Sequence, residues 1–388
     1  MTGGSVHIVI ANPYGYELFE PGARATRVYG GAEVQLYHLA TTLAAMPDIR
    51  VSMVVERPRS GPLRDVVDGV TMRFVTAMPR LDRLRRYLPV PSPTYLNALV
   101  RCGGDVVVQR GGAVLTADAA LAAAVSRVPF VFMAAHDWDC TRQHVTGRQR
   151  LAGEIYLWAL RRAELVIAQT DDQAGFLRRW HDIDAPVLRS GLPAAVGLPD
   201  RPHPAEAPVL WVGRCVAWKR PEAFLALAQR LTHRQFVMVC PIYDGEEDLA
   251  ERVRAHAEAL PNLEFVSFVP FRETAALFGT AGMFVNTSTA EGFPNTFMQA
   301  TSAGTPVASL SIDSDDLIQR HGIGVVGNGS ISMLADRVEE MLGDRAMWQA
   351  ASTASLNYFA ANHELDSIAA ILASILRQIA AAGRRAPT

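Results

Sequence analysis

Short apolar runs rich in Val, Ile and Phe recur along this chain and alternate with stretches of helical period. A strand buried on both faces appears as a continuous apolar run, and strands that alternate with helices form parallel sheets covered by helices on both sides. The pattern therefore predicts an α/β fold built from doubly wound parallel sheets. The runs are VHIVIA, VSMVVE, DVVVQR, FVFMAA, LVIAQT, VLWVG, FVMVC, EFVSFV, MFVNTS and PVASL.

The chain length and one proline-rich stretch predict two domains. At 388 residues the chain exceeds what one hydrophobic core usually supports. Residues 190–208, which read SGLPAAVGLPDRPHPAEAP, are too irregular for a helix or strand and are predicted to be an interdomain linker. We expect Rossmann-like domains over 1–189 and 209–355 that face each other across a cleft, with the carboxyl ends of both sets of strands bordering one ligand site.

The composition argues against several classes of protein. A net charge of −2 gives no general signal of nucleic-acid binding. The four cysteines are widely spaced and form no CxxC pair, so we expect buried, inert thiols in a reducing cytoplasm, without a disulfide scaffold or zinc site. We also expect neither a signal peptide nor a membrane span, because the amino terminus leads directly into a short strand-like run.

A single lysine marks a predicted anion site. All but one of the 37 basic side chains are arginines, and the exception, Lys219, lies in LWVGRCVAWKRPEAFLALAQRL, between a strand-like run and an amphipathic helix. Such a turn presents free N–H groups and the positive end of a helix dipole, which favour phosphate. Lys219 would add a point charge, and Arg214 can hold two oxygens at once. Chance survival of one lysine in an arginine-rich chain is the alternative.

The segment after the apolar run MFVN carries the most specific pattern. Glu291 precedes the turn Gly292, Phe293 and Pro294, and a helix is predicted from about Asn295 to Ser302. Pro294 suits a first helical position, where its missing N–H is not needed, and the remaining N–H groups of the turn can face a ligand. Gln299 follows Glu291 by two helical turns, so both are expected within reach of one extended ligand.

This segment resembles the hallmark of the retaining glycosyltransferases of family 4, which have the two-domain GT-B fold and carry two glutamates separated by seven residues. Glu291 matches the first glutamate, and the resemblance implies that it contacts the donor sugar. Gln299 stands where the family has the second glutamate, which contacts the ribose of the donor nucleotide. An amide both donates and accepts hydrogen bonds and can share that task.

Other segments follow in the order that the family implies, over nearly the whole chain. The resemblance assigns Arg214 and Lys219 to the donor diphosphate. It assigns Gly30 and Gly31, in YGGAEVQLYHLATTLA, to a turn that approaches the donor phosphates, although a plain tight turn is the alternative. His136 ends the run FVFMAAH and is assigned to a hydroxyl of the donor sugar near the transfer site.

The paired aspartates Asp137 and Asp139 imitate the DxD motif by which another glycosyltransferase fold holds a divalent cation. Since Arg214, Lys219 and a helix amino terminus would already supply positive charge, no metal is predicted. We expect these acids to organise the loop after His136, and we expect Asp313 and Asp315 to be loop caps.

The resemblance implies transfer of a hexosyl group from a nucleoside diphosphate sugar, with UDP-sugar or GDP-sugar favoured, to an acceptor hydroxyl. The anomeric configuration would be retained by attack on the face from which the phosphate leaves. No other cofactor is implied. The implied setting is synthesis of cell-surface polysaccharide or glycoconjugate in the cytoplasm, at or near the inner face of the membrane.

The acceptor is predicted to contact the first domain. The stretch RFVTAMPRLDRLRRYLPVPSPTYLNALVR interleaves arginines with leucines, which suits an anionic membrane or a lipid-linked acceptor. A solvated face whose leucines pack on the core is equally open. The arginines concerned are Arg80, Arg83, Arg85 and Arg86.

The carboxyl-terminal stretch is predicted to be helical, and in the GT-B fold the last helix returns to the first domain, so residues 356–388 are assigned there. Its predicted core contacts are Leu365, Ile368, Ile371, Leu372 and Ile375.

Two other functions stay open. A UDP-sugar 2-epimerase also uses two doubly wound domains, although EGFPNTFMQ argues against it. A non-catalytic nucleotide-sugar binding or assembly subunit is conceivable because of Gln299.

Overall fold

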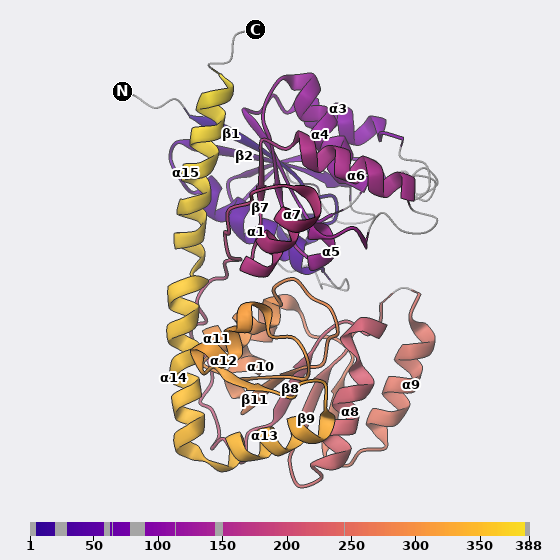
Figure 1. The fold of residues 1–388 in the computed structure, drawn as a ribbon, viewed down its shortest axis with the longest axis vertical. Helices are drawn as coiled ribbons and strands as arrows, with labels where there is room; N and C mark the ends of the chain where they lie inside the picture. Colours follow the sequence, from indigo (N-terminus) through magenta and orange to yellow (C-terminus); the bar gives the residue numbers. More distant parts are fainter. Residues whose placement is uncertain are drawn as a thin grey trace. The chain divides into compact units, whose positions relative to one another are not determined.

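The computed structural model describes residues 5–19, 29–57, 63, 65–77, 90–112, 114–143, 150–243 and 245–384. The described chain forms two compact units, each with its own sheet (Figure 1). Unit 1 contains the described residues up to Gly191 and again from Leu365 onward, and unit 2 is Leu192–Glu364. The predicted α/β fold with two parallel sheets is confirmed.

Unit 1 is built on a seven-stranded sheet in the order β3-β4-β2-β1-β5-β6-β7. Its neighbouring strands are parallel except for the short antiparallel pair β3 and β4. The strands are β1 (Val6–Ala11), β2 (Ile49–Glu56), β3 (Val66–Val67), β4 (Val70–Val75), β5 (Val106–Arg110), β6 (Phe130–Met133) and β7 (Leu165–Ile167). Five of them coincide with predicted runs. β3 and β4 lie at one edge, and the mixed burial of β4 explains why it lacks a continuous apolar run.

The helices of unit 1 follow the strands and cover both faces of the sheet (Figure 1). The 3-10 helix η1 is Tyr16–Phe19, and the α-helices are α1 (Gly31–Ala44), α3 (Pro93–Arg101), α4 (Val114–Ser126), α5 (Asp137–Cys140), α6 (Arg150–Arg162), α7 (Asp171–His181) and α15 (Leu365–Gly383).

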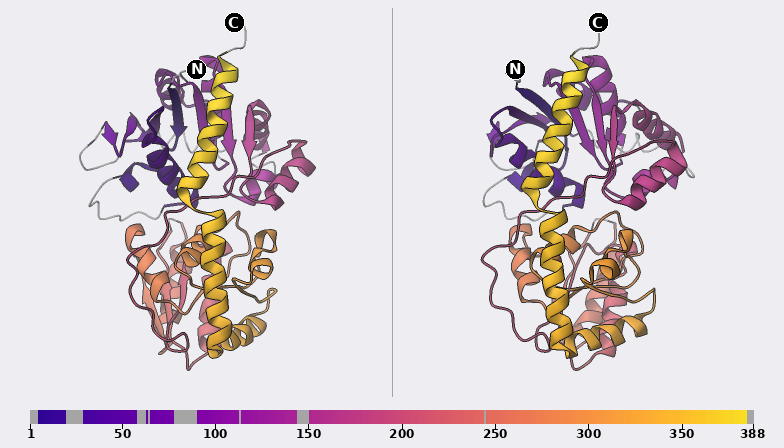
Figure 2. Two further views of the ribbon diagram at one scale, coloured as in Figure 1. Left: turned by 90° about the vertical axis from the view of Figure 1, so that its left-hand side faces the viewer. Right: turned by 60° about the vertical axis from the view of Figure 1, so that its left-hand side comes forward.

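The last helix, α15, lies along unit 1 (Figure 2), where it contacts α1, β1 and β5. Leu365, Ile368 and Leu372 are buried as predicted. Ile371 is 49% exposed, so that prediction was wrong, because a 3.6-residue period turns it about 100° from Leu372. Among the described helices, α15 alone is long and apolar enough to cross a membrane by length and composition, but one of its faces packs on unit 1.

Unit 2 is built on a six-stranded parallel sheet in the order β10-β9-β8-β11-β12-β13. Its strands are β8 (Val209–Val212), β9 (Phe236–Val239), β10 (Leu263–Val266), β11 (Met283–Asn286), β12 (Val307–Ser309) and β13 (Gly324–Val326). The first five match predicted runs. β13 lies among glycines, in GIGVVGNG, and matches no predicted run.

The helices of unit 2 again alternate with the strands. The 3-10 helices are η4 (Ala217–Lys219), η5 (Phe271–Glu273) and η6 (Ser314–Asp316), and the α-helices are α8 (Pro221–Arg230), α9 (Glu247–Glu258), α10 (Thr274–Thr280), α11 (Asn295–Ser302), α12 (Leu317–His321), α13 (Ile331–Gly343) and α14 (Arg345–Asn362). The range 356–388 therefore spans the end of α14, in unit 2, and all of α15, in unit 1.

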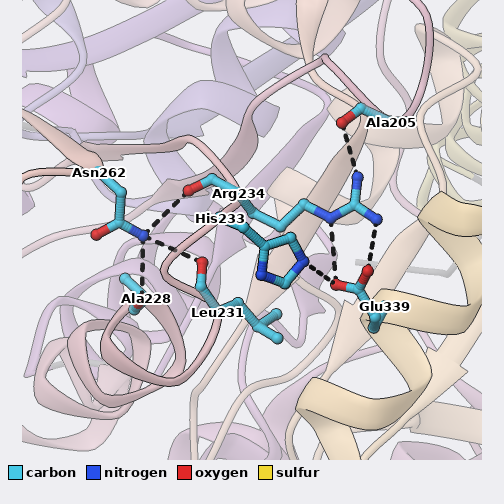
Figure 3. Close-up of polar contacts among 7 residues, drawn as sticks. All are labelled: Ala205, Ala228, Leu231, His233, Arg234, Asn262 and Glu339. Carbon is cyan, nitrogen blue, oxygen red and sulfur yellow. Dashed lines mark hydrogen bonds and ion pairs between the residues drawn. The ribbon is translucent and has the colours of Figure 1, made fainter.

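A polar cluster ties together the amino-terminal edge of the unit 2 sheet (Figure 3). Asn262, just before β10, donates from Nδ2 to three backbone carbonyls at 3.0–3.2 Å. Arg234, just before β9, donates to both carboxylate oxygens of Glu339 on α13, at 2.7 and 3.2 Å. These contacts are structural and lie at the opposite edge from the carboxyl ends of the strands.

Candidate active site

Each sheet contains a point where the direction of winding reverses. In unit 2, β8 lies between β9 and β11, and in unit 1, β1 lies between β2 and β5. Open α/β sheets bind ligands outside the carboxyl ends of the strands at such points. The loops to consider are therefore those after β8 and β11 in unit 2, and those after β1 and β5 in unit 1.

In unit 2 the single lysine meets the predicted catalytic glutamate. Lys219 ends η4, after β8, and Glu291 lies in the loop after β11. Lys219 Nζ contacts Glu291 Oε1 directly, and their side chains are 17% and 11% exposed. Arg220, in the left-handed conformation (φ 48°), separates Lys219 from α8. The pair therefore bridges the two loops at the reversal point.

The loop that carries Lys219 is anchored to the end of β11. Thr287 donates from Oγ1 to the carbonyl oxygen of Lys219 (2.6 Å) and accepts a hydrogen bond from Trp211 Nε1 (2.9 Å). The N–H of Thr289 donates to the carbonyl oxygen of Trp218 (2.8 Å). These contacts hold the backbone of the loop in place.

Arg214, in the same loop, rests against two aromatic rings. Its guanidinium carbon lies 5.0 Å from the ring centroid of Tyr243 and 6.0 Å from that of Trp218. Within the described part of the chain, its side chain forms no ion pair or hydrogen bond. Cation–π contact uses the faces of the guanidinium and leaves its N–H edge for a planar or tetrahedral anion.

The turn after Glu291 is fixed by its own packing. The Phe293 side chain is buried against Phe297 and His363, with centroid separations of 6.3 and 4.7 Å, so Phe293 can offer a ligand only its backbone. The carbonyl of Gly292 accepts a hydrogen bond from Ser314 Oγ (3.0 Å). Pro294 is the N-cap residue of α11, one position before the first helical position that was predicted for it.

Gln299, in the middle of α11, is half-buried and donates from Nε2 to Thr274 Oγ1 of α10 at 3.0 Å. This contact leaves its side-chain oxygen as an acceptor, which suits a hydroxyl donor.

In unit 1, His136 is the N-cap residue of α5 at the carboxyl end of β6. Its Nδ1 accepts a hydrogen bond from the N–H of Trp138 (3.2 Å). The neutral imidazole must therefore carry its proton on Nε2, which makes that atom a donor. Asp139 Oδ2 accepts the N–H groups of Ala135 and His136 at 2.9 and 3.0 Å.

These bonds support the interpretation of the aspartates as organisers of the loop. Asp137 Oδ1 accepts a hydrogen bond from Gln173 Nε2 (3.1 Å), and Asp313 Oδ1 accepts the N–H of Ile318 (2.7 Å). Among the described residues, no group of three or more His, Cys, Asp or Glu side chains has the arrangement of a metal site.

The glycine turn of unit 1 lies close to the turn of His136. Gly30 is the N-cap of α1 and Gly31 its first residue. Gly111, after β5, is in the left-handed region (φ 81°), and a Cβ at this position would lie 3.5 Å from the Cβ atoms of both Ala32 and Ala135. The turns after β1, β5 and β6 therefore meet at one edge of the sheet.

Two family models match the chain. The model described as Glycosyltransferase Family 4 matches residues 29–189, and the model described as Glycosyl transferases group 1 matches residues 206–344. Together they include all the predicted site residues. The chain belongs to the family 4 glycosyltransferases.

Solved structures of low sequence identity share the fold of this glycosyltransferase. Sucrose-phosphate synthase from Thermosynechococcus elongatus is 18% identical, with a TM-score of 0.77 over 97% of this chain and 100% of that chain. Anabaena HepE, in complex with UDP and glucose, is 16% identical, with a TM-score of 0.72 over 96% and 100%. At these identities the likeness shows the GT-B fold alone. No curated protein sequence gave a significant match.

Sequence reasoning missed several residues that support the candidate site of this glycosyltransferase, among them Arg110, Gln169, Thr287 and Tyr243. The run DVVVQRGG, a strand followed by an arginine and two glycines, was a signal for Arg110. The proposed acceptor residues Arg80, Arg83, Arg85 and Arg86 lie outside the described residues. Of the four cysteines, Cys102 is half-buried and the other three are buried.

Proposed function

We propose that this glycosyltransferase transfers a hexosyl group from a nucleoside diphosphate sugar to an acceptor hydroxyl, with retention of configuration and without a metal ion. The observation that carries the proposal is the Lys219–Glu291 pair beside Arg214 at the reversal point of the unit 2 sheet. The complex of HepE with UDP and glucose and an E. coli trehalose-6-phosphate protein bound with UDP-2-fluoro glucose support a UDP-sugar as the first donor to test.

The leaving diphosphate would be held in unit 2. Arg214 has its N–H edge available and Lys219 brings a compact ammonium, so both can stabilise the negative charge that grows on the phosphate. Glu291 would accept a hydrogen bond from a hydroxyl of the donor sugar, and Gln299 from the ribose. The backbone of residues 292–294 would line the same donor site.

His136 would act as a hydrogen-bond donor to a sugar hydroxyl. Because its Nδ1 is engaged by the N–H of Trp138, its Nε2 carries a proton and cannot take one from the acceptor in that state. The acceptor proton would pass to the departing phosphate oxygen as the new glycosidic bond forms on the same face. Gly30 and Gly31 would let the backbone of unit 1 approach the donor phosphates.

The proposed setting is assembly of polysaccharide or glycoconjugate in the cytoplasm. Arg80, Arg83, Arg85 and Arg86 would contact the acceptor or an anionic membrane surface. Changing all four to glutamine should reduce cosedimentation with anionic liposomes, and unchanged cosedimentation would refute the membrane contact.

Calorimetry with UDP, GDP, ADP and dTDP in EDTA tests the donor site. One diphosphate should bind to the wild-type chain and bind clearly more weakly to Lys219→Ala. Binding that appears only with magnesium or manganese would refute the metal-free site. The anomeric configuration of the product, read by NMR, then tests retention.

A further inference from the structure

Arg110 is a buried cation at the reversal point of the unit 1 sheet. It ends β5, next to β1, and the residue is 6% exposed. Its Nη2 donates to Gln169 Oε1 (3.0 Å) and to Ser190 Oγ (2.7 Å). Its Nε is buried and forms no hydrogen bond with the described residues.

The charge on Arg110 makes a purely stabilising role a poor explanation. Burial lowers the pKa of Arg110 to about 10, against the opposing effect of the Asp139 carboxylate, so the side chain is still charged at neutral pH. Both hydrogen bonds that Arg110 forms with described residues go to neutral oxygens, and no carboxylate in that part of the chain forms an ion pair with it. A buried charge that lacks a closely paired counter-ion is unfavourable for folding.

The contacts of Arg110 lead to the turn that carries His136. Gln169 lies just after β7. Its Oε1 accepts hydrogen bonds from Arg110 and from Ser190 Oγ (3.0 Å). Its Nε2 donates a hydrogen bond to the carbonyl oxygen of Ala135 (2.7 Å). Ala135 precedes His136 directly, and its N–H and that of His136 are held by Asp139. The Ala135–His136 peptides are therefore fixed from both sides.

Two partners with a single hydrogen-bonding role set the orientation of the Gln169 amide: the Ala135 carbonyl can only accept, and the Arg110 guanidinium can only donate. Ser190 can donate or accept and is compatible with either orientation, whereas a guanidinium has no acceptor. Arg110 and the Ala135 carbonyl together direct Oε1 toward Arg110 and Nε2 toward Ala135. Without Arg110, the Gln169 Oε1 keeps only the Ser190 hydroxyl as a donor, so the side chain is held less firmly against the Ala135 carbonyl and the turn loses part of its support.

We propose that Arg110 is a positioning residue that acts through Gln169 to aim the Nε2–H of His136. This inference rests on the proposed function, in which His136 contacts the donor sugar. The carboxyl end of β5 would then support catalysis indirectly, because Arg110 positions His136 without touching the substrate.

Nitrogen NMR of the histidine rings tests the positioning without any turnover. The wild-type spectrum should show His136, assigned by comparison with His136→Gln, with its proton on Nε2. In Arg110→Met the signal should broaden or shift toward a mixture of tautomers. An unchanged His136 signal in a folded Arg110→Met protein would overturn the proposal.

Kinetics give the second test, with release of UDP from UDP-glucose as the readout. Arg110→Met should lower kcat at least about 10-fold, because small misplacements of a site are costly, and leave the Kd of UDP within about 2-fold. In a His136→Ala background it should have no further effect. If the losses of kcat in the two variants are fully additive, Arg110 does not act through His136. If His136→Ala turns over normally, the proposed role of His136 is refuted, and the NMR test alone decides whether Arg110 positions the histidine.

Gln169→Glu covers the case in which Arg110→Met does not fold. It keeps an acceptor for Arg110 and pairs its charge, but removes the donor to Ala135. The same change in the His136 signal is expected, and a wild-type signal would overturn the proposal. Arg110→Lys, which is also a donor without an acceptor, should recover part of the lost kcat.

Discussion

Replacement of Glu291 by glutamine should move nucleotide binding and transfer in opposite directions. Glu291 and Lys219 are in direct contact with side chains only 11% and 17% exposed. If Lys219 also binds the donor diphosphate, the phosphate must compete with the Glu291 carboxylate for the ammonium. Glu291→Gln removes the competing charge and preserves the shape of the side chain.

The size of the effect follows from the burial of the pair. Opposite charges about 4 Å apart attract by about 4 kcal/mol at an effective dielectric constant of 20. Desolvation and the ordering of both side chains offset much of that attraction. A net competition of about 1–2 kcal/mol would make UDP binding to Glu291→Gln about 5- to 30-fold tighter. Transfer should become slower, because the charged acceptor for the sugar hydroxyl is lost.

Calorimetry with UDP in EDTA measures the first effect, and product formation measures the second. Unchanged or weaker UDP binding by Glu291→Gln would refute the competition. The Lys219→Met background separates competition for the ammonium from simple repulsion between Glu291 and phosphate. If Glu291→Gln tightens UDP equally in that background, the competition is not for Lys219.

Glu339→Gln is a matched control. It changes the net charge of unit 2 by the same amount and also breaks an ion pair, with Arg234 (Figure 3). That pair lies at the amino-terminal edge of the sheet, away from the loops after β8 and β11. UDP affinity should stay within about 2-fold of wild type. A change comparable to that of Glu291→Gln would mean that general electrostatics explain both.

Three further predictions concern single side chains. Tyr243→Leu should weaken UDP binding about 2- to 5-fold in calorimetry, since Arg214 loses a ring worth about 0.5–1 kcal/mol. Tyr243→Phe should have no effect, and equal losses in the two variants would exclude cation–π support. Burial lowers the pKa of His38 from 6.5 to about 4. As the pH falls, the unfolded chain therefore binds this proton before the folded chain does, and the free energy of unfolding decreases by about 3 kcal/mol between pH 6.5 and 4. In urea unfolding, His38→Leu should lack this part of the pH dependence, and the same dependence in both proteins would contradict the prediction. Gln299→Glu, tested by product formation, should change transfer less than about 3-fold if the amide is a working variant, and a large gain would mean a degenerate site.

Much of the fold could be predicted because the relevant information is local. Strands buried on both faces need continuous apolar side chains, and ten such runs marked ten of the strands. β4, in which buried and exposed positions are mixed, and the short strands β3 and β13 left no pattern of that kind. Ile371 was misassigned because an apolar residue on a helix belongs to the core only if its angular position faces a neighbour.

The residue types of the candidate site were also visible in the sequence by themselves: one lysine among arginines, a glutamate before a glycine turn, and a histidine after a buried run. Which of them meet was decided only by tertiary structure. Lys219 and Glu291 are 72 positions apart and touch because β8 and β11 are neighbours. Arg110 reaches the turn of His136 through Gln169 because β5, β6 and β7 lie side by side. Local periodicity sets the elements, but the order of strands in a sheet depends on long-range pairing and packing, and that order determines which loops share an edge.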